Sequence, residues 1–271
     1  MPNNQQFFND NGYIISKKII SLSGSDHLYK TLVLLAKKYQ KDFPLNVMNE
    51  KSWEGDSFNN ALIALRKNKP EIFGAIYDSI QNSAILSLNV CNESILKIVS
   101  KILECDVEGI AVSGVMMRMD APNDNRNRLK WHQENSYYPQ NLKGENGVTL
   151  WSPLHNFKKE YGSIELCIKS HKTGKFEIKK IPNQKQLFNS EQYEINSQQL
   201  KQFEKIKILI PSGDALFFNM DLIHRSGYNS SNKFRFSIGA RFHKMLTNDF
   251  MPGRNYYEPN MKIGRLSNNE L

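Results

Sequence analysis

The sequence of 271 residues predicts a single domain with an all-β core of the double-stranded β-helix type, a cupin-like jelly roll, and a helical cover packed on its sheet. Two observations predict this fold class. Residues 1–108 carry apolar positions at helical spacing, whereas residues 109–248 consist of short apolar segments separated by turn formers. Short strands at such spacing are typical of sandwiches and barrels. A chain of this length, 39% hydrophobic and 23% charged, can bury a full core.

The N-terminal part predicts helices that cover a sheet. The first helix has apolar side chains on one face, and Ser25 or Asp26 is positioned to cap it. Pro70 separates two further helical stretches, because proline is tolerated only in the first turn of a helix. The expected helices cover residues 26–41, 58–66, 71–81 and about 93–104.

The remaining chain predicts the strands of the core. An insert at about residues 172–205 is rich in Lys, Gln, Asn and Glu; it predicts an exposed connection and is a candidate lid over the barrel mouth. Residues 249–271, with Pro252, Gly253, Pro259 and a Tyr256-Tyr257 pair, predict an irregular tail. The expected strands cover residues 110–119, 129–133, 148–155, 164–168, 206–210, 215–219 and 234–243.

The motif His132-Gln133-Glu134 indicates a metal site. Residues separated by one position point to the same face of a strand, so His132 and Glu134 can act together. His224, 92 residues after His132, can supply a third ligand from a distant strand. Two histidines and one carboxylate form the facial triad of non-haem Fe(II) oxygenases, which leaves the opposite face open for a co-substrate and O₂.

Arg235 is the expected anchor for the co-substrate carboxylate. The planar fork of arginine pairs well with planar carboxylates and keeps its charge. Ser226 lies two residues after His224, and the turn formers of residues 227–232 predict that the strands on either side form an antiparallel pair. That pairing would place Arg235 beside Ser226, so that both side chains share one carboxylate.

Several motifs together resemble the phytanoyl-CoA dioxygenase family of Fe(II)/2-oxoglutarate oxygenases. Residues 8–15 also resemble the short element that opens many members, and the match runs from about residue 7 to 243 in the family's order. One departure is Glu134, where the family usually has aspartate; the extra methylene adds about 1.5 Å of reach. The motifs are Trp131-His132-Gln133-Glu134, Trp151-Ser152-Pro153-Leu154, Gly162-Ser163-Ile164-Glu165-Leu166, Ser170-His171-Lys172, Gly213-Asp214 with Phe217-Phe218, and His224-Arg225-Ser226-Gly227-Tyr228-Asn229 with Arg235.

The resemblance implies a catalytic domain with a defined set of cofactors: Fe(II), 2-oxoglutarate and O₂. It implies that His132, Glu134 and His224 hold the iron. It also implies that Arg235 and Ser226 bind 2-oxoglutarate, with Gln133 and Trp151 lining its pocket. The expected reaction is hydroxylation of an aliphatic C–H bond with release of succinate and CO₂, although desaturation, ring closure or epimerisation would use the same residues.

Four residues are candidates for substrate binding. Tyr137 and Tyr138 follow the ligand motif directly, and Arg118 and Arg241 lie on expected strands. A charge at the barrel mouth is costly unless it pairs with a ligand or an acid, so inward-pointing arginines indicate a small anionic substrate. Alternatively, both arginines are solvated or pair with an acid such as Asp120.

The composition says more about the cellular compartment of the protein than about its binding partners. The net charge of +9 comes from scattered Lys and Arg, which a lysine- and asparagine-rich composition explains more simply than an anionic partner does. Cys91, Cys105 and Cys167 follow no disulfide or zinc spacing, so we expect a reducing cytoplasm. No signal pattern and no apolar run of membrane-spanning length is visible, and the sequence predicts no oligomeric state.

Two other functions are compatible with parts of the pattern. Alkyl-base demethylases of nucleic acids use the same cofactors and carry two arginines six residues apart, as Arg235 and Arg241 are. The eleven-residue step from His224 to Arg235 and the lack of an aromatic, basic groove disfavour nucleic acid as a partner. A jelly roll that binds a small ligand without catalysis would explain the strands alone. His155 and His171 are expected to be structural or to support the site from outside the ligand set.

Overall fold

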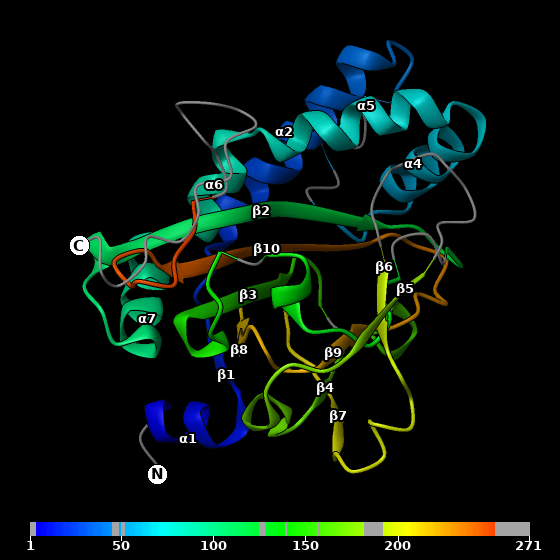
Figure 1. The fold of residues 1–271 in the computed structure, drawn as a ribbon. Coiled ribbons are helices and arrows are strands. Elements are labelled where there is room, and N and C mark those ends of the chain that lie inside the picture. Colours follow the sequence, from blue (N-terminus) through cyan, green and yellow to red (C-terminus); the bar gives the residue numbers. More distant parts are fainter. Residues whose placement is uncertain are drawn as a thin grey trace, which may run out of the picture.

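The fold is that of a computed structural model, which describes residues 4–44, 49, 52–124, 128–138, 140–156, 158–181 and 192–252. Two antiparallel β-sheets form the core, and helices α2, α4, α5 and α6 lie on one side of the long strands β2 and β10 (Figure 1). The predicted fold class is therefore confirmed. The expected irregular tail lies outside the described residues from Gly253 onward.

All four expected helices are present, and among the described residues one further helix precedes them and another separates the last two. The first expected helix begins at Leu22, because Ser21 caps it by accepting the Gly24 N–H at 3.0 Å; the expectation that Ser25 or Asp26 caps it was wrong. The described helices are α1 (Asn4–Asn11), α2 (Leu22–Tyr39), α4 (Asp56–Asn68), α5 (Pro70–Gln81), α6 (Ala84–Val90) and α7 (Glu93–Leu103).

The strands follow the expected order with changes in length. The described strands are β1 (Tyr13–Ser16), β2 (Ile110–Asp120), β3 (Gly147–Pro153), β4 (Ile164–Cys167), β5 (Ile178–Ile181), β6 (Gln192–Ile195), β7 (Lys205–Lys207), β8 (Ala215–Asn219), β9 (His224–Ser226) and β10 (Arg235–Lys244). Short 3-10 turns cover Val107–Gly109, Glu134–Ser136, Gly144–Asn146, Lys159–Tyr161 and Ser170–Thr173. The main sheet has the order β1-β8-β3-β10-β2, a smaller sheet has the order β7-β4-β9, and β5 pairs with β6.

Strand β10 shows how the sequence positions the site. Its alternate residues Phe236, Ile238, Ala240 and Phe242 belong to the core cluster that the helices share. A pocket between the two sheets is lined by the alternate positions Arg235, Ser237, Gly239 and Arg241. Because successive side chains of a strand point to opposite faces, one strand supports the helical cover and the pocket at once.

Three expectations about the strands need correction. The expected strand at residues 129–133 is reduced to a single bridge between His132 and His224, whose N–H and C=O groups pair at 3.0 Å. Strand β9 pairs with β4, and β10 pairs with β2 and β3, so the expected pairing of β9 with β10 was wrong. The insert at 172–205 is not wholly exposed, because it forms the β5–β6 pair and buries Ile195 and Leu200.

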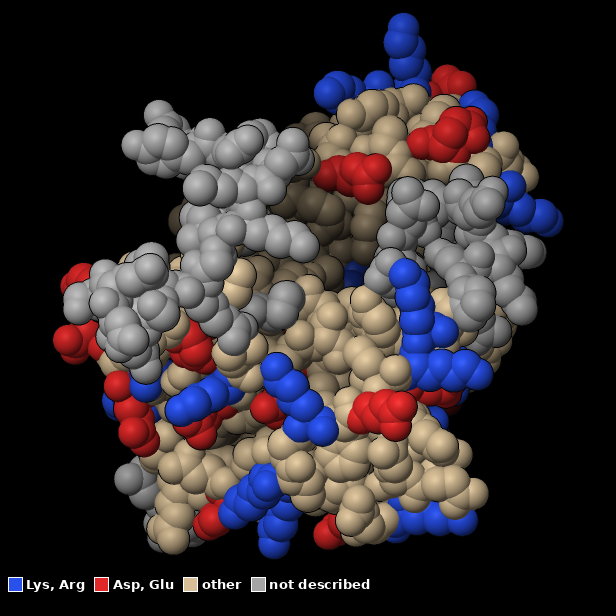
Figure 2. Space-filling model, viewed as in Figure 1, with Lys and Arg blue, Asp and Glu red and all other residues tan. Residues whose placement is uncertain are grey.

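The surface carries both charge signs. On the face shown in Figure 2, lysine and arginine side chains are dispersed among acidic ones, and a hollow opens between the helices and the strand core. This distribution agrees with a compositional origin of the net charge of +9. Among the helices described, none combines the length and apolar character that a membrane crossing requires.

Candidate metal centre

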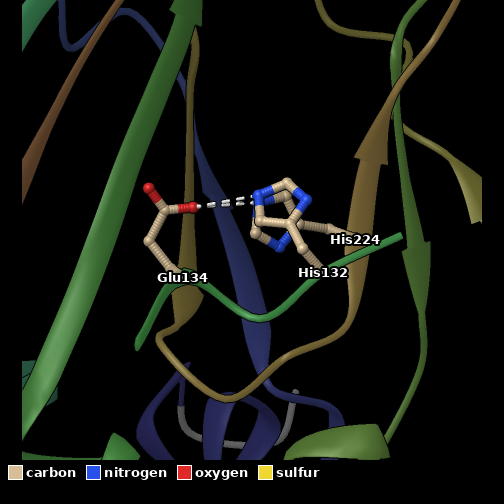
Figure 3. A group of neighbouring side chains, drawn as sticks. All are labelled: His132, Glu134 and His224. Atoms are coloured by element: carbon tan, nitrogen blue, oxygen red, sulfur yellow. Dashed lines mark ion pairs between the residues drawn. The ribbon is translucent and has the colours of Figure 1, made fainter. Parts of the chain in front are cut away.

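Three predicted ligands, His132, Glu134 and His224, converge in the interior between the sheets. The Nε2 atoms of His132 and His224 lie 3.5 Å and 3.0 Å from Glu134 Oε2 (Figure 3). Their ligand atoms all lie within 4.8 Å of one another, and all three side chains are buried. The bridge between the two histidine residues holds their backbones together, and Glu134 starts the 3-10 turn that follows.

The protonation of the site suits a metal ion. His132 Nδ1 lies 2.6 Å from the Lys130 carbonyl oxygen and His224 Nδ1 lies 2.9 Å from that of Leu222, so each Nδ1–H donates to the backbone and each Nε2 lone pair faces Glu134. Burial and the neighbouring His224 lower the pKa of His132. Burial raises the pKa of Glu134, but Arg241 and the two histidines hold it well below its usual value.

The buried ligand atoms of this cluster fit a divalent cation. His132 Nε2 and Glu134 Oε2 are fully buried and form no hydrogen bond among the described residues. Buried polar atoms in proteins are nearly always paired, so two convergent exceptions point to a missing positive partner. Two neutral imidazoles and one carboxylate are the ligand set of non-haem iron.

The pocket beside the ligands contains most of the predicted site residues. His224 packs against Phe218 with ring centroids 4.5 Å apart. Arg118, Trp151, Ser226, Arg235 and Arg241 all line the pocket, together with Met116, Asp120, Leu129, Thr149, Leu150, Ile164, Ser237, Ile238 and Gly239. Ser226 and Arg235 therefore reach one pocket from opposite sheets, although their strands are not paired.

Gln133 does not line this pocket, which corrects its expected place beside the co-substrate. Its amide nitrogen donates at 2.8 Å to the carbonyl oxygens of Gly174 and Asp221, and its amide oxygen accepts the Phe176 N–H at 2.9 Å. The side chain thus points away from the metal ligands that flank it. Its role in the described structure is to attach the ligand segment to the neighbouring loops.

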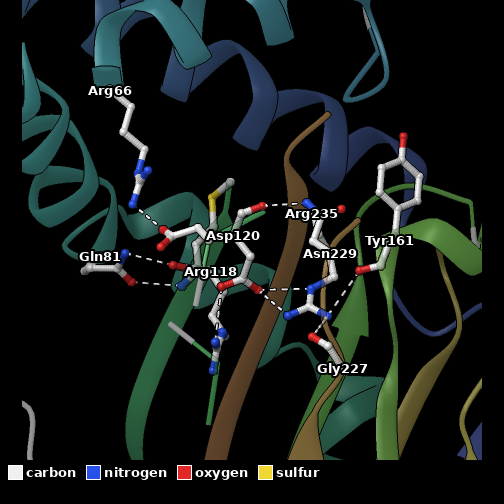
Figure 4. Close-up of polar contacts among 10 residues, drawn as sticks. Arg66, Gln81, Arg118, Asp120, Tyr161, Gly227, Asn229 and Arg235 are labelled. Atoms are coloured by element: carbon white, nitrogen blue, oxygen red, sulfur yellow. Dashed lines mark hydrogen bonds and ion pairs between the residues drawn. The ribbon is translucent and has the colours of Figure 1, made fainter. Parts of the chain in front are cut away.

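Arg235 is held from several sides by other parts of the protein. Its Nε and Nη2 atoms donate to Asp120 Oδ2 at 3.0 and 2.7 Å, and Nη1 donates to the carbonyl oxygens of Tyr161 and Gly227 at 3.3 and 3.0 Å (Figure 4). These four bonds leave one of the five N–H groups without an acceptor among the described residues. Most of the Arg235 guanidinium is therefore engaged by protein acceptors.

Asp120 joins two arginines of the pocket. Its Oδ1 accepts Arg118 Nη2 at 3.1 Å, while its Oδ2 accepts Arg235. Burial raises the pKa of Asp120, but the two arginines outweigh burial and lower it. The alternative that Arg118 pairs with Asp120 is therefore correct. Ser237 and Gly239 were not predicted to line the pocket, although strand alternation from Arg235 places both on the pocket face.

The variant Asp120→Asn is expected to lower the free energy of unfolding by about 3–5 kcal/mol, because the buried Arg235 and the partly buried Arg118 lose their anion. Urea denaturation followed by circular dichroism measures this change. The matched control is Asp106→Asn, since Asp106 is exposed. Equal urea midpoints for Asp120→Asn and the parent protein would show that the pairs contribute nothing to stability.

The other predicted residues lie around the ligands. Arg241 donates from Nε to Glu134 Oε1 at 2.6 Å, and the Tyr138 ring lies 4.4 Å from its guanidinium carbon. Tyr137 packs edge-on against His132 with centroids 5.2 Å apart, and its hydroxyl oxygen accepts the Tyr193 N–H. Neither tyrosine lines the pocket itself.

The histidines at 155 and 171 do not join the ligand cluster. His155 Nδ1 lies 3.0 Å from the carbonyl oxygen of Asn156, and its ring packs on Tyr161. His171 Nε2 lies 3.1 Å from the carbonyl oxygen of Asn9. Both contact the backbone outside the group formed by the three ligands.

The comparison with protein families identifies the family of this chain. The family described as Phytanoyl-CoA dioxygenase (PhyH) matches residues 45–237, which is most of the chain. The chain belongs to the phytanoyl-CoA dioxygenase family. Membership confirms the resemblance, and it makes this protein a 2-oxoglutarate-dependent non-haem iron oxygenase with iron and 2-oxoglutarate as its cofactors. No curated protein matches the sequence.

Solved structures resemble this phytanoyl-CoA dioxygenase family member in fold at low identity. The epimerase SnoN, solved with Fe3+, alpha ketoglutarate and nogalamycin RO, is 13% identical over 98% of this chain and 95% of its own, with a TM-score of 0.61. EvdO2 from Micromonospora carbonacea var. aurantiaca, complexed with 2-oxoglutarate, is 16% identical over 90% and 91%, with a TM-score of 0.57. The apo non-heme monooxygenase ThoJ is 13% identical over 89% and 77%, with a TM-score of 0.59.

Proposed function

We propose that the protein hydroxylates an aliphatic C–H bond of a small anionic metabolite and converts 2-oxoglutarate to succinate and CO₂. One oxygen atom of O₂ enters the alcohol and the other enters succinate, so the reaction balances. The convergence of His132, Glu134 and His224 beside a pocket lined by arginines carries this proposal. Iron bound by these three residues supplies the activation of O₂.

The protein orients the co-substrate through the end of the pocket that contains Arg235. The remaining N–H of Arg235 Nη2 and the hydroxyl of Ser226 are positioned to donate to the distal carboxylate of 2-oxoglutarate. Asp120 and the two carbonyl oxygens keep the guanidinium from rotating, which lowers the entropy cost of binding. Trp151 lines the same pocket and excludes water from it.

Charge balance in the pocket supports an anionic substrate. Arg118, Arg235 and Arg241 bring three positive charges, and Asp120 and Glu134 bring two negative ones. The charges of Fe(II) and of the 2-oxoglutarate dianion cancel, so one positive charge remains. Arg118 is the most exposed of the three arginines, with 16% of its side chain accessible against 7% for Arg235 and 9% for Arg241.

We propose that Arg118 is the first of the three arginines to contact the substrate anion, because its side chain is the most exposed. Tyr137 and Tyr138 contact His132 and Arg241 outside the pocket lining, so they are proposed to contact the part of the substrate that extends beyond the pocket. Arg241 is proposed to act through Glu134, since its guanidinium donates a hydrogen bond to that carboxylate. This arrangement places an oxidisable C–H bond next to the metal ligands.

The experiment that tests the proposal is substrate-stimulated succinate release by the iron-loaded protein. Small carboxylates and phosphates are compared with their neutral analogues and with methylated oligonucleotides. Stimulation by an anion but not by its neutral analogue supports the proposal. Stimulation by oligonucleotides alone would favour a demethylase, and a neutral best substrate would end the anionic assignment.

Arg118→Ala is expected to raise the KM for an anionic substrate at least tenfold, which corresponds to about 1.4 kcal/mol, because a desolvated anion loses its cation. The affinities for iron and 2-oxoglutarate should change little. Arg66→Ala is the matched control, since Arg66 pairs with Asp124 and does not line the pocket. Parent-like substrate kinetics in Arg118→Ala would place the anion elsewhere.

We further propose that the protein acts in the cytoplasm. Cys91, Cys105 and Cys167 are all free, which supports a reducing compartment. Such a compartment also helps to keep iron ferrous. Cell fractionation with antibodies against the protein tests this location.

A further inference from the structure

We propose that Arg241 is a positioning residue that restrains Glu134 so that one carboxylate oxygen, Oε2, is presented to the metal. The inference rests on the ligand assignment above and goes beyond it by giving Arg241 a defined task. The two carboxylate oxygens are in different surroundings. Oε1 accepts the Nε–H of Arg241 at 2.6 Å and also contacts Nη2.

The other oxygen, Oε2, is turned toward the histidines. It lies 3.0 Å from His224 Nε2 and 3.5 Å from His132 Nε2, and Figure 3 shows Oε1 pointing away from both rings. No described donor forms a hydrogen bond with Oε2. One oxygen is thus committed to Arg241 and the other is available to an ion.

Arg241 can restrain Glu134 because it is itself held. Its Nη1 atom donates to the carbonyl oxygen of Gly114 at 2.9 Å, and Tyr138 covers one face of the guanidinium at 4.4 Å from the ring centroid. The side chain is almost fully buried. A guanidinium bound at its edge and stacked on its face has little freedom to rotate.

A β-bulge makes this arrangement possible. The register between β10 and β2 shifts between Gly239 and Arg241, opposite Gly114. Gly114 has a φ of +53°, and a Cβ there would lie 2.4 Å from Cε1 of Tyr138. A side chain at this position would therefore be strained and would displace the ring that stacks on Arg241.

The restraint answers a difficulty that a glutamate ligand creates. Glutamate has one more rotatable bond than aspartate, and an unrestrained carboxylate can bind a metal through both oxygens. Two-oxygen binding would occupy a position that the facial triad leaves for co-substrate or O₂. By holding Oε1, Arg241 keeps Glu134 to one contact and offsets its extra freedom.

The test uses Co(II) as the probe under anaerobic conditions, without 2-oxoglutarate. Arg241→Met, which keeps length but removes charge and donors, is expected to weaken the visible d–d bands of bound Co(II), because these bands lose intensity when a further oxygen joins the metal. It should also strengthen Co(II) binding, because the freed carboxylate binds through both oxygens and a neighbouring positive charge is lost. Arg241→Lys should restore part of the parent affinity but not the parent spectrum, since lysine keeps the charge and lacks the fork.

A double-mutant cycle with Glu134→Asp isolates the contact. The shorter side chain loses Arg241, so adding Arg241→Met to Glu134→Asp should have much less effect on Co(II) affinity than adding it to the parent. Additive effects would overturn the inference, as would a parent-like spectrum in Arg241→Met. If His132→Ala and His224→Ala also bound Co(II) normally, the ligand assignment itself would fail; that result is distinct from failure of the Arg241 inference alone.

Gly114→Ala provides a second approach that leaves Arg241 in place. It is expected to change the Co(II) spectrum in the same direction as Arg241→Met. Gly213→Ala is the matched control, because Gly213 also has a positive φ, +92°, but its added Cβ would meet only the Ile20 carbonyl oxygen at 3.5 Å. A spectral change in both variants would assign the effect to backbone strain and overturn this part of the inference.

Discussion

His132→Ala and His224→Ala are expected to abolish stoichiometric Fe(II) binding. Each substitution removes one of three converging donors and leaves a buried carboxylate with a single imidazole. The parent protein should bind one Fe(II) per chain and, with 2-oxoglutarate, should show the weak visible charge-transfer band of an iron chelate. Anaerobic titration followed by absorbance measures both properties.

The control for this experiment is His171→Ala, because His171 lies outside the ligand cluster and contacts the Asn9 carbonyl oxygen. It should retain the iron and the band. Parent-like iron binding in either ligand variant would show that the three side chains do not hold the metal.

Arg235→Ala is expected to raise the concentration of 2-oxoglutarate required for turnover by a factor that corresponds to about 2–5 kcal/mol, because a confined charge-assisted contact is lost. Iron binding should survive. Arg235→Lys should recover only a small part, since lysine cannot donate to Asp120 and to the carbonyl oxygens of Tyr161 and Gly227 in the same geometry. Calorimetric titration of 2-oxoglutarate into the metal-loaded protein measures the affinity.

Arg225→Ala is the matched control for Arg235→Ala. Arg225 lies on strand β9 next to Ser226, but its side chain pairs with Glu165 and stacks on Trp131. The same loss of charge should therefore leave the co-substrate affinity nearly unchanged. Equal affinities in Arg235→Ala and the parent would move the carboxylate anchor to another residue.

Local patterns predicted the helices and the convergence of the three candidate ligands. His132 and Glu134 were identified from their spacing of two, which places side chains on one face. The same alternation places Gln133 on the opposite face, and its hydrogen bonds to Gly174, Asp221 and Phe176 agree. Gln133 was expected in the pocket because of the family resemblance, whereas the alternation of side chains alone places it on the opposite face.

Contacts between distant segments could not be predicted. The turn formers after Ser226 were equally compatible with a hairpin and with a crossing between sheets, because turn propensity does not determine the strand partner. The crossing brings Arg235 to Asp120, 115 residues away in the sequence. The bulge at Gly114 likewise depends on pairing with β10, which no local pattern in β2 reveals.

The burial of β10 on both faces restricts how this enzyme can be redesigned. A substitution at Phe236 or Ile238 alters the packing beneath the helices, and one at Arg235 or Arg241 alters the chemistry, so no described position from 235 to 243 offers a neutral change. Altered substrate preference is therefore more accessible by varying Arg118 on the edge strand β2, or the tyrosines that follow the ligand motif. Directed evolution of this protein would best begin with libraries at those positions and leave the central strand intact.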